Sequence, residues 1–170
     1  AIAKSAGIII NWDDFSDLSS VIPSLVKMYP NGSADVNYFQ ACGGMSYLIK
    51  ELINHGLLHA DVRTILGKGL HSYTQEPFLK EGALVWRKGP DSSLDEMVLT
   101  SVENAFSKTG GLKVLNGNLG NSVIKVSAVK KENWIVKAPA LIFEDQKDLL
   151  EAFNRKELNK DFIAVVRYQG

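Results

Sequence analysis

Apolar residues in the first part of the chain recur with the period of an α-helix, most clearly between Met45 and Ile53. The apolar side chains at positions 45, 48, 49, 52 and 53 follow one another every three or four residues, as along one buried face of a helix. Gly56 follows as a residue typical of helix C-termini. The pattern therefore predicts one well-defined helix, buried along this stripe and ended by Gly56.

Shorter helical patterns precede this helix. The stretch 13–30 predicts two short helices, because Pro23 would break a helix interior but suits the first turn of a second helix. Ser33 is placed to cap a further short helix that runs through Phe39. We therefore expect a helical first part up to about Gly89, with turn-rich sequence at its end.

The pattern changes after Gly89-Pro90 to short apolar runs bounded by glycine or polar clusters, which is typical of β-strands. Residues 93–100 are compatible with either a helix start or the first strand. Asp145 is placed to cap a helix in which Leu149 and its apolar neighbours share a face. Three runs predict strands, at residues 122–129, 134–143 and 162–168. The chain thus reads as a helical first half and a mainly β second half.

The two ends of the chain carry helix and strand patterns without closing turns. Residues 1–7 read as the last turn of a helix with Gly7 as its stop, and residues 161–170 read as a strand. We therefore expect a segment of a longer chain.

The composition narrows the classes of partner. The 170 residues are 45% hydrophobic, which is ample for a core, and carry 19 basic and 19 acidic side chains. A formal charge of zero gives no electrostatic footprint for a nucleic-acid backbone or an anionic membrane surface. We expect small-molecule or protein partners, no nucleic acid and no membrane. One cysteine cannot form an internal disulfide, so a cytoplasmic setting is expected.

Cys42 and the histidines raise the question of a nucleophilic or metal site. Cys42 precedes a helix, whose dipole would stabilise a thiolate, but free cysteine more often serves as a small buried apolar group. His55 and His59 have the spacing of helical metal ligands, yet Gly56 should end the helix between them. We therefore expect packing for Cys42 and no metal ligand in this chain.

A stretch rich in glycine and asparagine, residues 110–122, precedes a predicted strand. Its backbone amides could cradle a phosphate or carboxylate, but it lacks the lysine and hydroxyl of a phosphate-binding loop. A tight turn between strands, with Gly117 and Gly120 at positive φ, is the favoured interpretation. Lys125 lies just beyond, where its amine points either into a site or to solvent.

Six stretches, read together, resemble the dihydroxy-acid and 6-phosphogluconate dehydratase family. They are NWDDFSDLSSVIP, YPNGSADVNYFQACGGM, GLLHADVRTILGKGL, GGLKVLNGNLGNSVIKVSAV, APALIFEDQ and DFIAVVRYQG. They appear in the family's order and spacing and cover essentially the whole chain. INWDDFSDLS, YPNG and GNLG are similar to the 6-phosphogluconate branch, whereas the branched-chain amino-acid enzymes usually read GNLAP at the last of these.

The resemblance implies a mixed α and β fold, in which the helical end of an α/β N-terminal domain is followed by the start of a C-terminal β-barrel-like domain. Residues 1–92 would be the C-terminal part of the helical, cluster-bearing domain, and residues 93–170 the first part of the swivelling-type barrel domain. The implied activity is an iron–sulfur-dependent hydro-lyase of the Entner-Doudoroff pathway. It converts 6-phosphogluconate to 2-keto-3-deoxy-6-phosphogluconate through an enol, with a homodimer as the full-length enzyme.

The same resemblance places the catalytic groups outside this chain. The cysteines of the iron–sulfur cluster, expected to be 4Fe-4S, precede it, and the serine proposed as base follows Gly170; a divalent cation is also compatible. We therefore expect no catalytic, cofactor-binding or metal-binding residue here, and an inactive isolated segment. The candidates for substrate contact are Asn118, Asn121 and Lys125.

Three positions depart from the family's usual sequence. Cys42 stands where alanine is common and so matches no cluster ligand. Asn121 replaces the arginine that usually follows GNLG, so a non-phosphorylated sugar acid or a dihydroxy acid is the alternative substrate. Arg63 replaces an asparagine without a consequence that we can derive. A further alternative is a structural or interface module with no activity of its own.

Overall fold

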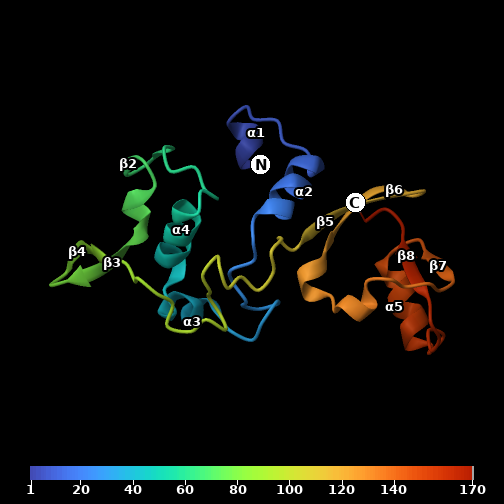
Figure 1. Ribbon diagram of the computed structural model, residues 1–170. Coiled ribbons are helices and arrows are strands. Elements are labelled where there is room, and N and C mark those ends of the chain that lie inside the picture. Colours follow the sequence, from blue (N-terminus) through green and yellow to red (C-terminus); the bar gives the residue numbers. More distant parts are fainter. Residues whose placement is uncertain (170) are drawn as a thin grey trace. The chain divides into compact units, whose positions relative to one another are not determined.

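The computed structural model describes residues 1–169, and the chain divides into two compact units between Val129 and Lys130 (Figure 1). The first unit contains α1 (Ile2–Ser5), α2 (Trp12–Val21), α3 (Val36–Ala41), α4 (Gly44–Asn54), β1 (Arg63–Thr64), β2 (Gly67–Lys68), η1 (His71–Thr74), β3 (Gln75–Lys80), β4 (Ala83–Lys88), β5 (Leu112–Gly117), β6 (Gly120–Lys125) and η2 (Val126–Ala128). The second contains η3 (Lys131–Asn133), β7 (Ala140–Phe143), α5 (Gln146–Asn154) and β8 (Ile163–Val166). The expected mixture of α and β structure is confirmed. Within the described residues the strands pair two by two and close no barrel.

The compact units do not divide at the boundary that we expect between residues 92 and 93. Residues 98–100 lie in the core of the first unit, where Val98 is 8% exposed, Leu99 0% and Thr100 1%. For the domains of a longer protein, the boundary at 92 and 93 stays a prediction.

Both ends of helix α2 are determined by residues close to them in the sequence. The Asn11 side chain accepts a hydrogen bond from the Asp14 N–H (3.0 Å), and the Asp14 carboxylate accepts one from the Asn11 N–H (2.7 Å), which forms a capping box. The helix ends at Val21 because Ile22 precedes Pro23, and a residue before proline is driven to extended backbone. Ile22 accordingly has ψ 118°.

The second short helix predicted after Pro23 is wrong. This segment instead runs extended through the core of the first unit. The Lys27 N–H donates to the Val98 carbonyl oxygen (2.8 Å), and the Thr100 N–H donates to the Leu25 carbonyl oxygen (3.0 Å). Isolated β-bridges join Ser24 to Ser107, Val26 to Leu99 and Met28 to Ala34. These long-range hydrogen bonds replace the helical ones that the local sequence suggested.

Helices α3 and α4 follow this extended segment. Asp35, and not Ser33, caps α3, because its carboxylate accepts a hydrogen bond from the Tyr38 N–H (2.7 Å). Helix α4 ends at Asn54, and Gly56 follows at φ 67°, as predicted. The predicted stripe is not its most buried face: Tyr47 is 5% exposed, whereas Met45 is 53% exposed.

The hydrophobic core of the first unit joins α3 and α4 to residues 98 and 99, which follow a turn after β4. It consists of Phe39, Cys42, Tyr47, Val98 and Leu99, which are all buried. Residues 98 and 99 approach α3 and α4 from more than forty positions away in the sequence, so this core depends on tertiary packing. Residues 93–100 accordingly form neither the regular helix nor the regular strand that the sequence left open.

A β-hairpin of β3 and β4 occupies sequence that we expected to be helical or turn-rich. Six residue pairs join the strands in antiparallel register, from Gln75 opposite Lys88 to Lys80 opposite Ala83. The connecting residues Glu81 and Gly82 have φ 51° and 80°. Tight two-residue hairpin turns favour positive φ, which Gly82 adopts readily because glycine has no Cβ atom.

Strands β5 and β6 form a second antiparallel hairpin whose turn lies between Gly117 and Gly120. The tight-turn interpretation of residues 110–122 is therefore confirmed, although only Gly120 of the two glycines has a positive φ (105°). At its base, the Ser19 hydroxyl on α2 donates to the Leu112 carbonyl oxygen (2.9 Å) and accepts from the Leu112 N–H (3.2 Å). The strand predicted over 122–129 ends at Lys125, and η2 begins at the next residue, Val126.

The second unit pairs β7 and β8 in parallel, with α5 in the connection between them. The Asp145 carboxylate accepts a hydrogen bond from the Asp148 N–H (2.9 Å) and caps α5 as predicted. The run 134–143 is a strand only from Ala140, directly after Pro139, which has no N–H for a sheet ladder. Among the described residues, no helix combines the length and apolar character that crossing a membrane requires.

Candidate functional site

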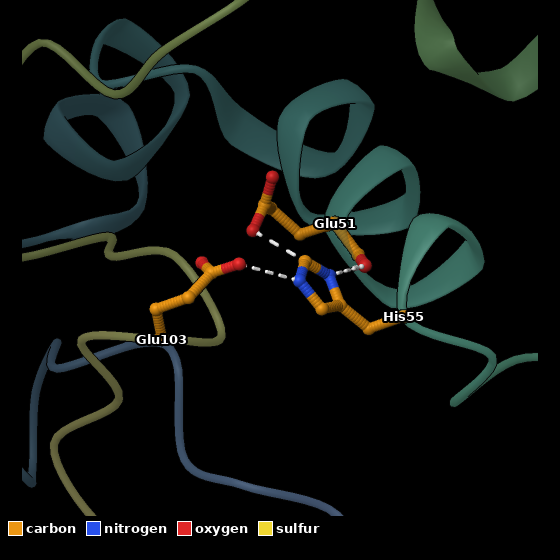
Figure 2. A group of neighbouring side chains, drawn as sticks. All are labelled: Glu51, His55 and Glu103. Carbon is orange, nitrogen blue, oxygen red and sulfur yellow. Dashed lines mark hydrogen bonds and ion pairs between the residues drawn. The ribbon is translucent and has the colours of Figure 1, made fainter.

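Three side chains of metal-ligand type converge at the C-terminal end of α4 (Figure 2). Glu51 lies in the last turn of α4, His55 is its C-cap, and Glu103 comes from the loop between β4 and β5. The Nε2 atom of His55 lies 2.7 Å from Oε1 of Glu103. Its Nδ1 atom lies 2.9 Å from the Glu51 main-chain oxygen and 4.0 Å from Glu51 Oε2. One ligand atom from each residue lies within 4.8 Å of the other two.

The environment of this Glu51–His55–Glu103 cluster favours a protonated histidine. Hydrogen bonds, first to the Glu51 main-chain oxygen and then to the Glu103 carboxylate, raise the pKa of His55 above its ordinary value. The pKa of Glu103 is lowered, first by its own main-chain N–H and then by His55. Both ring nitrogens of His55 face acceptors, and only the imidazolium donates to both.

Sequence reasoning missed the two glutamates of this cluster. It considered His55 only together with His59 and rejected that pair, whereas the group that the structure brings together contains His55 with Glu51 and Glu103. Glu51 stands four residues before His55 on the same helix, which was a usable signal. Glu103 lies 48 residues after His55 in the sequence, and no local pattern indicates that they meet.

Cys42 lies in the core of the first unit and is 2% exposed. Burial, and then the negative charge of Asp95, raise the pKa of its thiol. A reactive cysteine needs a stabilised thiolate and access to solvent, and this residue has neither. The structure thus gives Cys42 the environment that the packing interpretation predicts.

A hollow of about 470 Å³ lies in the first unit beside the N-terminal part of α3. Its polar lining includes Lys27, Ser33, Tyr38 and Asp95. The Tyr38 hydroxyl donates to Asp95 Oδ2 (2.9 Å), and this hydrogen bond raises the pKa of the phenol. Tyr38 therefore stays protonated at neutral pH and is no candidate for a base. The hollow can receive a small polar group, but Asn118, Asn121 and Lys125 are not among its lining residues.

The three predicted contact residues lie on the β5–β6 hairpin and are exposed. Asn118 is in the turn. Asn121 and Lys125 lie on one face of β6, with Val123 between them on the same face. Four residues of strand separate Asn121 from Lys125 by about 13 Å. Asn121 and Lys125 thus lie on the same face of the strand, but the three residues do not form a compact site.

Two models of one protein family match the chain. The model described as dihydroxy-acid/6-phosphogluconate dehydratase N-terminal matches residues 1–73, and its C-terminal counterpart matches residues 97–170. Among similar proteins, the phosphogluconate dehydratases of Pseudomonas aeruginosa and Escherichia coli K12 are 55% and 54% identical over 170 residues. A dihydroxy-acid dehydratase of Acetivibrio thermocellus is 34% identical over 172 residues. Each comparison covers the whole chain but only 28% of the relative's length.

Both parts of the chain therefore match one class of proteins, the dehydratases. The chain belongs to the dihydroxy-acid/6-phosphogluconate dehydratase family. The family resemblance inferred from the six sequence stretches is confirmed.

Proposed function

We propose that this chain is part of a 6-phosphogluconate dehydratase. The observation that carries the proposal is the difference in identity between the two kinds of relative. Phosphogluconate dehydratases reach 55% and 54%, whereas the dihydroxy-acid dehydratase reaches 34%. The chain spans 28% of these relatives, so the activity is proposed for a longer protein that contains it.

The proposed reaction removes water from 6-phosphogluconate to give 2-keto-3-deoxy-6-phosphogluconate. A base takes the proton from C2, the C3 hydroxyl leaves, and the resulting enol takes up a proton at C3 as it becomes the ketone. Hydroxide is a poor leaving group, so the step needs an acid or Lewis acid at the C3 oxygen. An iron–sulfur cluster, which the family resemblance implies, would supply that Lewis acid when bound.

The residues of this chain do not fit an iron–sulfur cluster. Such clusters are held by several cysteine thiolates, and Cys42 is the one cysteine in the sequence. It is buried among apolar side chains, and its pKa is raised. We therefore propose that the cluster ligands lie in the remainder of the longer enzyme and that the isolated chain is inactive. A homodimer is proposed on the same family grounds, and a cytoplasmic setting is proposed because one cysteine cannot form an internal disulfide.

For this chain, we propose a part in substrate binding through the β5–β6 hairpin. Lys125 offers an ammonium group, and Asn121 on the same face and Asn118 in the turn offer side-chain amides. Charged hydrogen bonds from such groups suit the carboxylate or phosphate of a sugar acid. Lys113 pairs with Ile124 and so lies on the opposite face of the same hairpin. It provides a control of equal charge.

The test uses the longer enzyme with Lys125→Met and Lys113→Met. A hydrogen bond to a charged group contributes about 1.5–3 kcal/mol, so Lys125→Met should raise KM for 6-phosphogluconate by about ten- to hundredfold. Lys113→Met should leave it unchanged. Equal KM values for both variants and the parent would remove Lys125 from the substrate site without affecting the assignment of the reaction.

The reaction itself is tested by 2-keto acid formation from 6-phosphogluconate, gluconate and a branched 2,3-dihydroxy acid. The proposal predicts the highest kcat/KM for 6-phosphogluconate. Asn121, which stands where the family usually has arginine, favours the second candidate, a dehydratase of non-phosphorylated sugar acids. A higher kcat/KM for gluconate would support that candidate, and turnover of the dihydroxy acid alone would exclude both.

A further inference from the structure

We propose that Glu51, His55 and Glu103 form a binding site for a divalent transition-metal ion, with zinc as the best match. The site lies outside the hairpin to which substrate binding is assigned, and it does not depend on the proposed reaction. An imidazole with two carboxylates suits zinc and neighbouring first-row ions, with water in the remaining positions.

The first argument is the charge of the cluster. The ion pairs of Glu51 and Glu103 within the described residues are both with His55. Two carboxylates therefore share one imidazolium, which leaves a formal charge of −1, or −2 when the ring is neutral. The C-terminal end of the eleven-residue helix α4 adds further negative potential at the same place. A divalent cation would neutralise this excess charge.

The second argument is the orientation of the histidine. The main-chain oxygen of Glu51 can only accept a hydrogen bond, so the Nδ1 atom of His55 at 2.9 Å carries the proton. In the neutral ring this leaves the lone pair on Nε2, which points toward Glu103 Oε1 (Figure 2). Metal-binding histidines characteristically have their other ring nitrogen held by a carbonyl or carboxylate in this way.

The third argument is the combination of fixed and adjustable ligands. The Glu51 side chain is only 13% exposed, and its Oε2 atom accepts a hydrogen bond from the Val102 N–H (3.2 Å), so it is held in place. Metal–ligand bonds of about 2.1 Å would put two ligand atoms about 3.0–3.4 Å apart. Glu103 Oε1, now 2.7 Å from Nε2, must withdraw slightly, and its side chain is 67% exposed and has room to do so.

The experiment measures zinc binding by the metal-stripped 170-residue chain in competition with a chromophoric chelator. His55→Gln and Glu103→Gln remove single ligands. His59→Gln is the matched control, because it removes a nearby histidine that is outside the cluster. We expect one zinc ion per chain, affinity at least tenfold lower in the first two variants, and no change in His59→Gln. Zinc-edge X-ray absorption should detect one imidazole ligand, lost in His55→Gln.

Two results would overturn the site. One is equal zinc affinity in the parent chain and in both His55→Gln and Glu103→Gln. The other is the lack of any stoichiometric zinc binding in a folded parent chain. If the 170-residue chain folds poorly, the titration is repeated in the longer protein. There, the difference in zinc affinity between His55→Gln and His59→Gln distinguishes this site from zinc bound by cysteines elsewhere. Failure of the dehydratase assay would leave these results unaffected.

Discussion

The ammonium group of Lys50, on α4, lies 2.6 Å from Oδ1 of Asp91, just beyond β4. The other carboxylate oxygen of Asp91 pairs with Lys88 at the end of β4. Lys50 also donates to the Pro90 carbonyl oxygen (3.4 Å). One exposed aspartate thus connects α4 to the end of the β3–β4 hairpin through two cations.

These contacts predict a measurable pKa. Hydrogen bonds from Lys50 and then Lys88 lower the pKa of Asp91 from 3.8 to about 2. A carboxyl group whose pKa is lower in the folded chain stabilises the fold at any pH above its pKa in the unfolded chain. This contribution is lost as the pH falls from about 4 to about 2. In a carboxyl NMR titration, Asp91 should titrate near pH 2 and Lys50→Met should move its midpoint upward. A midpoint near 3.8 in the parent chain would contradict the ion pairs.

A second prediction concerns Gly89, directly before Pro90. A Cβ atom at this position would lie 2.1 Å from the Thr74 main-chain oxygen. Because that oxygen belongs to the backbone, it cannot move away at low cost. Gly89→Ala should lower the free energy of unfolding by about 1–3 kcal/mol, the usual cost of overpacking. Gly117→Ala is the control, because its Cβ meets nothing within 4 Å and its φ is not positive. Urea unfolding of both variants gives the comparison, and equal stabilities would refute the close approach.

Local signals predicted the elements whose determinants lie within a few residues. The cap of α5 at Asp145 and the stop of α4 before Gly56 are confirmed, since a carboxylate near an N–H or a glycine at positive φ acts over one turn. The extended path after Pro23 was missed because its hydrogen bonds go to partners such as Val98 and Thr100, far along the chain. Glu103 was missed for the same reason, as only the fold brings it to His55.

The family was predictable because six stretches stand in a fixed order over the chain, which is far more specific than any single motif. Individual contact residues were not predictable to the same degree. The hairpin register shows that Asn121 and Lys125 share a face, but a strand's alternation alone could not say whether that face meets solvent or substrate.

A third prediction follows from the burial of Cys42. In the native chain its thiol should react with iodoacetamide far more slowly than in urea, because burial raises its pKa and removes access. Cys42→Ala should cost only about 1 kcal/mol of stability. Cys42→Ser should cost more, since it places a hydroxyl among Phe39, Tyr47 and Leu99. In the longer enzyme, Cys42→Ala should retain its iron, and loss of iron from a folded variant would instead make Cys42 a ligand.

The last prediction separates two possible boundaries by limited trypsin digestion. A boundary between residues 92 and 93 would expose the chain near Lys88, whereas the compact units divide between Val129 and Lys130. Cleavage requires several consecutive residues to unfold locally. Residues 98–100 are buried and hydrogen-bonded to Leu25 and Lys27, so they oppose local unfolding of the chain around residue 92. Lys130 is 81% exposed in its side chain.

We therefore expect the first cuts after Lys130 or Lys131, with fragments that mass spectrometry identifies as residues 1–130 or 1–131. A variant with glutamine at both positions should be cleaved more slowly and elsewhere, whereas Lys108→Gln, before the β5–β6 hairpin, should not alter the first cut. Initial cleavage after Lys88 in the parent chain would mean that the core contacts of residues 98–100 open more readily than the segment between the two units, and would favour the boundary near residue 92.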